Sequence, residues 1–92
     1  AYGLTGMATV TLVYFAWVRE AIGRDEERVE LASPDETIAE LVARLAAQGG
    51  GYAEALADPD RLRAALDQQF VGFDQAIGTA RELALFPPVT GG

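Results

Sequence analysis

A strongly amphipathic helical pattern near the middle of the chain leaves few folds open to it. Four apolar residues recur there at the spacing i, i+3, i+4 and i+7: Ile38, Leu41, Val42 and Leu45. Such a stripe must be buried, because a helix with one apolar face gains most of its stability from packing. Thr37-Ile38-Ala39-Glu40 is a capping box that predicts the helix start, and Gly49-Gly50-Gly51 is expected to end the helix. The flanking sequence therefore has to supply a covering layer.

Two strand patterns precede this helix. Thr9–Phe15 is β-branched and aromatic, with apolar side chains alternating onto one face. Ala16–Ile22 has roughly helical apolar spacing, and Gly23 supplies the left-handed residue that ends short helices. Glu26–Leu31 alternates charged and apolar residues, so we expect it to pair back on the first strand as a hairpin.

Further strand patterns follow the helix. In order, we expect a short helical turn and a loop over Tyr52–Leu62, a third long strand over Leu66–Val71, a tight turn at Phe73-Asp74, a brief extended piece over Gln75–Ile77 and a last strand over Glu82–Phe86. Two strands, a crossover helix and more strands predict an α+β protein. The expected fold is a β-grasp (ubiquitin-like) fold, a mixed sheet of four to five strands wrapped on one main helix.

The composition excludes several kinds of site. The chain has 92 residues, enough for one domain, and a net charge of −7. Nucleic-acid binding is not expected, because it depends on neutralising phosphates with Lys and Arg, and a basic protein partner fits better. With no Cys and no His, thiolate or imidazole catalysis and the usual zinc sites are excluded. The adjacent acids Asp25-Glu26-Glu27 do not converge on one point, so no metal site is expected.

No membrane or targeting segment is expected. The longest apolar stretch, Ala8–Val18, is interrupted by threonines and falls short of the ~20 residues that a membrane helix needs. We therefore expect a cytoplasmic protein. Met7 is interpreted as the natural start and residues 1–6 as a cloning remnant. The expected organisation is a folded domain over residues 7–86 and a flexible Gly-Gly tail over residues 87–92.

The segment Phe86–Gly92 predicts an extended, solvated tail. Pro87 and Pro88 end the last strand and favour polyproline II, so the base of the tail is stiff. Gly91 and Gly92 have no Cβ, so they fit a slot that admits backbone only. At ~3.3–3.6 Å per residue, the tail reaches at most about 20 Å from the domain. An inert, frayed end is the alternative that the tail alone leaves open.

Four segments, three internal ones and the tail, match a known pattern: Phe15-Ala16, Val18-Arg19-Glu20, Val71-Gly72-Phe73-Asp74 and Phe86–Gly92. They resemble the MoaD family, the small subunit of molybdopterin synthase. The similarity extends from about Val10 to Gly92 and is specific at the tail. It implies a sulfur carrier of molybdenum cofactor biosynthesis whose working group is the C-terminal carboxylate of Gly92.

The resemblance also implies partners and a reaction sequence. A ubiquitin-activating-like adenylyltransferase would use ATP to adenylate the Gly92 carboxylate, and a sulfur donor would convert the acyl-adenylate to a thiocarboxylate. The large subunit of molybdopterin synthase would take up the tail, with Gly91 threading into it, and the thiocarboxylate would attack cyclic pyranopterin monophosphate. The implied assembly is a heterotetramer of two small and two large subunits. The chain itself would then be no enzyme and would bind no permanent cofactor.

Residues at the tail base are assigned to partner binding by the same resemblance. Phe15, Phe70 and Phe86 would form an exposed patch, although apolar character alone would place each ring in the core. The tail residues that would enter the partner are Pro87, Pro88, Val89 and Thr90. Arg19 and Glu20 are expected to form a solvated ion pair.

Two departures from the family pattern stand out, and Trp17 is left without a function. Asp67 is more commonly Asn in the family and is interpreted as a surface change. Thr79-Ala80-Arg81 stands where a Gly-Asp turn is usual, which alters the loop before the last strand. Trp17 is expected to be a core or lid residue.

Other functions share the same sequence features. A carrier for thiamine thiazole synthesis or tRNA thiolation would have the same fold and Gly-Gly end, but Phe86-Pro87-Pro88 favours the molybdopterin branch. A ubiquitin-like modifier would need the same adenylate and would form isopeptide bonds with lysines. A plain interaction module would tolerate an extra residue after Gly92.

Overall fold

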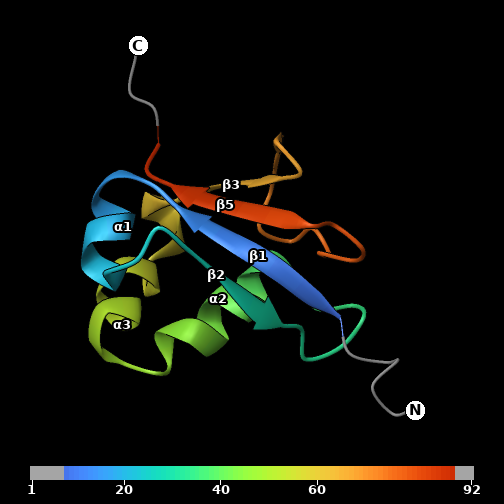
Figure 1. Cartoon of the computed structure of the whole chain (residues 1–92), viewed down its shortest axis with the longest axis horizontal. Coiled ribbons are helices and arrows are strands. Elements are labelled where there is room, and N and C mark those ends of the chain that lie inside the picture. Colours follow the sequence, from blue (N-terminus) through green and yellow to red (C-terminus); the bar gives the residue numbers. More distant parts are fainter. Residues whose placement is uncertain (1–7, 89–92) are drawn as a thin grey trace.

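A five-stranded mixed sheet forms one layer of the molecule, and helices cover one of its faces (Figure 1). The computed structural model describes residues 8–88. In chain order the elements are β1 (Thr9–Tyr14), α1 (Ala16–Ile22), β2 (Glu26–Glu30), α2 (Ile38–Ala46), α3 (Gly50–Leu56), a 3-10 turn (Pro59–Arg61), β3 (Arg63–Leu66), β4 (Gln69–Val71) and β5 (Glu82–Phe86). The strands lie in the order β2-β1-β5-β3-β4.

The first and last strands lie side by side in this sheet. β1 and β5 are parallel, with Leu12 opposite Leu83, whereas the other three pairs of strands are antiparallel. Strand alternation therefore sets one buried and one open face. Val10, Leu12 and Tyr14 of β1 are buried, and so are Leu83 and Leu85 of β5.

The predicted apolar stripe of α2 packs on this inner face. Ile38, Leu41, Val42 and Leu45 are all buried, and they belong to one core cluster with the inward strand residues. The predicted capping box is present at the start of α2, with Glu40 N–H donating to Thr37 Oγ1 and Thr37 N–H donating to Glu40 Oε1. These features confirm the predicted α+β, β-grasp (ubiquitin-like) architecture with one main helix.

The predicted strand Leu66–Val71 is wrong as a single element. It is a hairpin in which β3 begins at Arg63 and β4 runs antiparallel to it. Asp67 and Gln68 make the turn with φ angles of 49° and 73°. Two consecutive left-handed residues give the tight turn that matches strand twist, and Asp tolerates this region better than most residues. No Gly marks the turn, so the sequence carries no clear left-handed turn signal between the two strands.

The predicted role of Gly49-Gly50-Gly51 needs a second correction. α2 already ends at Ala46, and α3 begins at Gly50. At Gly51, a Cβ atom would overlap the carbonyl oxygen of Ala21. α3 thus crosses the last turn of α1 in backbone contact, and only Gly permits that approach. The expected helical turn over Tyr52–Leu62 is the end of α3 and the 3-10 turn.

Two acidic side chains that are largely buried, Glu27 and Glu36, link different secondary-structure elements by hydrogen bonds. Tyr14 and Tyr52 both donate to Glu27 Oε2, at 2.7 and 2.6 Å, which ties β1 and α3 to β2. Burial, with the Glu27 hydrogen bond, raises the pKa of both phenols. Glu36 is only 3% exposed, and it accepts two hydrogen bonds from Arg44 and one from the Ala32 amide.

None of the helices within residues 8–88 is long and apolar enough to cross a bilayer.

We predict that Gly51→Ala lowers the free energy of unfolding by about 1–3 kcal/mol, because the new methyl group forces α1 and α3 apart. The matched control is Gly72→Ala, whose Cβ would meet only the side-chain Oδ1 of Asp74 at 3.0 Å. Urea denaturation of both variants measures the difference. Equal stability of the two variants would show that the helices separate without cost.

Glu36 should make stability depend on acid pH. Hydrogen bonds from Arg44, with one from the Ala32 amide, hold the pKa of the Glu36 carboxyl below its usual range. A depressed pKa stabilises the fold above the unfolded value of about 4.3, and this contribution is lost as the pH falls through the folded value. We therefore expect Glu36→Gln to be destabilised at pH 7 by about 1–2 kcal/mol, since Arg44 loses a charged partner but stays partly solvated.

Urea unfolding of wild type and Glu36→Gln from pH 7 to pH 3 checks this. The difference between them should shrink below about pH 4.5. Glu26→Gln, an exposed change on β2, serves as the control and should track wild type throughout. If the difference in unfolding free energy between wild type and Glu36→Gln stays constant down to pH 3, the stabilising role of the ionised Glu36 carboxylate is contradicted.

Candidate functional site

The candidate site lies where β5 ends and the chain leaves the sheet. β5 sits between β1 and β3, so the exit is at the centre of the sheet (Figure 1). Phe86 is its last residue, and Pro87 and Pro88 follow it, both partly exposed. The predicted tail residues Val89, Thr90, Gly91 and Gly92 lie outside the described residues, as do the expected cloning remnant and Met7.

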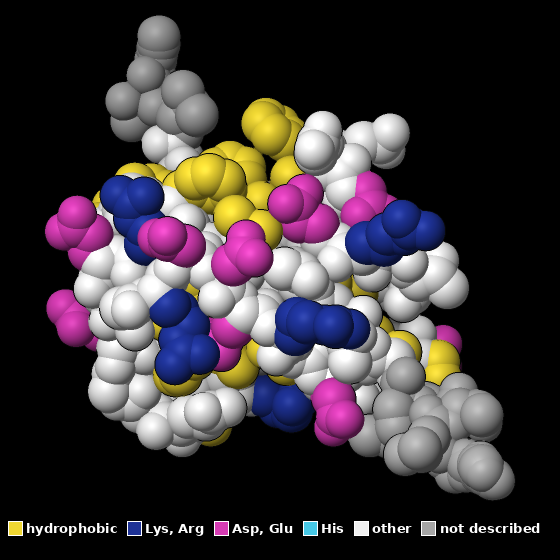
Figure 2. All heavy atoms as spheres, in the orientation of Figure 1, with side chains coloured by type: hydrophobic (Ala, Val, Ile, Leu, Met, Phe, Trp, Pro, Cys, Tyr) yellow, Lys and Arg dark blue, Asp and Glu magenta, His cyan; other side chains and the backbone are white. Residues whose placement is uncertain are grey.

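Three phenylalanines surround this exit and form what we call the aromatic face: Phe15, Phe70 and Phe86. The Phe86 ring meets Phe15 edge-on, with centroids 6.5 Å apart, and meets Phe70 at 5.6 Å. Phe15 is 47% exposed and Phe70 79% exposed, which makes them the large apolar side chains most open to solvent in the described chain. Figure 2 shows hydrophobic side chains gathered beside the base of the tail.

Strand register explains why these rings face outward. Leu83 and Leu85 point into the core, so Phe86 belongs to the opposite, open face of β5. Across that face Ala84 pairs with Ala65, and Ala65 pairs with Phe70. Ala65 and Ala84 thus form a flat apolar surface beside the rings. Such a surface can bind a partner, but these side chains supply no acid, base or nucleophile.

Asp67 contributes more to this region than the predicted surface change. Its Oδ1 accepts hydrogen bonds from the amides of Arg81 and Glu82, each at 3.0 Å, and its own amide donates to the Glu82 carbonyl at 2.9 Å. The β3–β4 turn is thereby fastened to the start of β5. Arg81, at the altered loop, is exposed and lines a shallow hollow with Thr9, Thr11 and Arg28.

The charged residues considered in the sequence take other roles. Arg19 lies 3.8 Å from Asp25 rather than pairing with Glu20, and both Arg19 and Asp25 are well exposed. In the acidic run, Glu27 turns inward to the two tyrosines while Glu26 stays exposed. Within residues 8–88, no three His, Cys, Asp or Glu side chains are placed to hold a metal ion.

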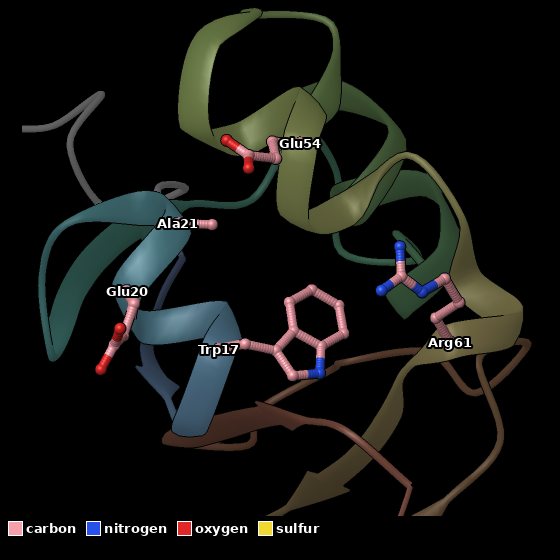
Figure 3. A pocket seen from close by; sticks show the side chains of 5 residues that line it. All are labelled: Trp17, Glu20, Ala21, Glu54 and Arg61. Atoms are coloured by element: carbon pink, nitrogen blue, oxygen red, sulfur yellow. The ribbon is translucent and has the colours of Figure 1, made fainter.

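One concavity was not predicted. A hollow of about 410 Å³ is lined by Trp17, Glu20, Ala21, Glu54 and Arg61 (Figure 3). Trp17 is half-buried, and the Arg61 guanidinium lies 4.7 Å from its ring centroid. Periodicity predicted Trp17 as a core or lid residue but could not bring Arg61 to it, because the two are far apart along the chain.

Comparison with known proteins supports one family. The profile of the ThiS family matches residues 12–92. The Escherichia coli molybdopterin synthase sulfur carrier subunit is 41% identical over 83 residues, covering 90% of this chain and 99% of the relative. The Haemophilus influenzae protein of the same name is 37% identical over 84 residues, with 90% and 99% covered.

A solved structure shows the same fold at lower identity. The small archaeal modifier protein 1 of Haloferax volcanii superimposes with a TM-score of 0.64 at 21% identity, covering 89% of this chain and 99% of that protein. At this identity the likeness concerns the fold alone. The family profile spans most of the chain, and two relatives match it nearly end to end: the chain belongs to the ThiS family.

Proposed function

We propose that this chain is the sulfur carrier subunit of a molybdopterin synthase and that the carboxylate of Gly92 carries the sulfur. Two relatives bearing that name, at 41% and 37% identity over nearly their full lengths, support this assignment. The structural observation that carries it is the aromatic face. An exposed apolar surface stands at the point where the tail departs, so docking there would present the tail to whatever binds.

The proposed reaction begins at the Gly92 carboxylate. A carboxylate oxygen attacks the α-phosphate of ATP on a ubiquitin-activating-like adenylyltransferase, and pyrophosphate leaves. Sulfide-level sulfur from a donor then attacks the acyl carbon, and AMP leaves, which produces a thiocarboxylate. The thiocarboxylate sulfur then displaces an oxygen substituent from a carbon of cyclic pyranopterin monophosphate on the large subunit. Water cleaves the acyl–sulfur bond, so the sulfur stays on the pterin and the Gly92 carboxylate is restored. The carrier needs no catalytic side chain of its own, in keeping with a sequence that has no Cys and no His.

In this proposal the carrier and its two partner proteins have different roles. The catalytic pocket lies on the large subunit, which receives Pro87–Gly92, and two carriers and two large subunits form a heterotetramer. The carrier holds no permanent cofactor, and ATP belongs to the activating enzyme. All of these steps take place in the cytoplasm. The net charge of −7 favours docking on basic surfaces of both partners.

A second candidate is a ubiquitin-like modifier. The observation that favours it is the likeness to the small archaeal modifier protein 1, with a TM-score of 0.64. Both functions require an adenylated terminus, and they differ in the acceptor, which is sulfide sulfur in one and a lysine amine in the other. A carrier for thiamine or tRNA thiolation would share the thiocarboxylate, so only sulfur transfer to the pterin precursor separates it from our proposal.

We predict that the protein, coexpressed with its activating enzyme and a sulfur source, exchanges one oxygen for one sulfur at Gly92. Intact-mass and C-terminal peptide mass spectrometry locate the change. Deleting Gly92 or adding one residue after it should abolish the exchange while leaving the melting temperature almost unchanged. Lysine conjugates without any thiocarboxylate would favour the modifier, and sulfur on another residue would exclude the carrier.

For Phe86→Ala we expect weaker binding to the large subunit by more than tenfold, since truncating an aromatic anchor typically costs ~2 kcal/mol or more. The isolated domain should keep most of its stability, because the ring lies on the open face. Phe73→Ala is the control: Phe73 packs against the core, so its loss should lower stability but not affinity. Calorimetric titration measures the affinity of both variants for the large subunit, and urea unfolding measures their stability. Native affinity with a collapse in stability for Phe86→Ala would refute the role.

A further inference from the structure

The hollow beside α1 has two chemically different ends. Its five lining residues come from α1, α3 and the 3-10 turn, and α1 and α3 are in contact where Gly51 approaches Ala21. Figure 3 shows the Trp17 ring and the Arg61 side chain facing each other at one end. Glu54 and Ala21 bound the other end, and Glu20 stands at its margin with the carboxylate turned outward.

Charge in the hollow points to a cationic ligand. The face of Trp17 already holds the Arg61 guanidinium, a cation–π contact. Within residues 8–88, neither Glu20 nor Glu54 is within ion-pair distance of a basic side chain, since the ion pairs there involve Arg19, Arg24 and Arg44 with other acids. Both glutamates are exposed. The acidic end therefore offers the uncompensated Glu54 carboxylate, with the equally unpaired Glu20 carboxylate at the outer margin of the hollow and Arg61 at its far end.

Position in the fold connects the hollow to the tail base. Trp17 lies two residues after Phe15, whose ring touches Phe86. Arg61 lies two residues before Arg63, and Arg63 is the partner of Phe86 across β3 and β5. The hollow and the aromatic face thus flank the same exit of the chain. A protein that covers one can reach the other.

We propose that this hollow receives one basic side chain, Arg or Lys, of the large subunit that takes up the tail. The inference rests on the proposed function. The cation lies against Glu54 with Glu20 nearby, its aliphatic stem contacts Ala21, and Arg61 remains on Trp17. The aromatic face supplies apolar contact area, whereas the hollow fixes the orientation of the carrier about its tail.

The test is binding of the full chain to its large subunit, with charge-neutral variants. The hollow variant is Glu20→Gln with Glu54→Gln. The control, Glu30→Gln with Asp35→Asn, removes the same charge from exposed positions in β2 and in the loop before α2. We expect the hollow variant to raise the dissociation constant by about five- to tenfold, mainly through faster dissociation. The control should slow association slightly, and added salt should remove that difference.

The outcomes separate the two proposals. Equal effects of the hollow and control variants at all salt concentrations overturn the inference while the proposed function stands. If the wild-type chain does not bind the large subunit at all, the proposed function falls and this inference with it. Glu54→Asp, which keeps the charge, should restore affinity to within about twofold of wild type. Because Glu20 and Glu54 are exposed, unchanged melting temperatures verify that folding is intact.

Discussion

Parallel pairing of β1 with β5 is the contact on which the rest of the structure depends. It joins the two ends of the domain, so the chain between them must cross over one face of the sheet, and α2 lies in that crossover between β2 and β3. Parallel strands have their carboxyl ends at the same edge. Phe15 follows the end of β1 and Phe86 ends β5, so the two rings meet beside the tail. The geometry of the candidate site is therefore a consequence of topology.

The elements that were predicted correctly are those whose ends are marked by residues close in the sequence. β1, α1 with Gly23 as its left-handed cap, the capping box of α2 and the bounds of β5 were predicted because caps, glycines and prolines mark them directly. The hairpin at Asp67-Gln68 was missed because its turn has no Gly. A helical turn was predicted from Tyr52, but the start of α3 at Gly50 was not, because Gly51 is placed by a tertiary contact with Ala21 that no local pattern reports.

The candidate site was predictable only in part, for a similar reason. Periodicity cannot distinguish an exposed phenylalanine from a buried one, so the aromatic face was expected only through the family resemblance. Its exposure follows from strand register, which is a property of the whole sheet. The hollow brings together Trp17 of α1 and Arg61 of the 3-10 turn, which are separated along the chain by β2, α2 and α3, and it had no signal in the sequence. Asp67 was underestimated because the backbone amides that donate to its carboxylate, those of Arg81 and Glu82, are distant along the chain.

The two edges of the sheet differ in a way that bears on solubility. Edge strands offer unpaired backbone groups to other chains and can nucleate aggregation. β2, at one edge, carries alternating charges at Glu26, Arg28 and Glu30 that oppose such pairing. β4, at the other edge, holds the highly exposed Phe70 but is only three residues long. Its shortness limits the number of hydrogen bonds that a second copy could form, so the exposed Phe70 lies on an edge that offers little backbone for strand pairing.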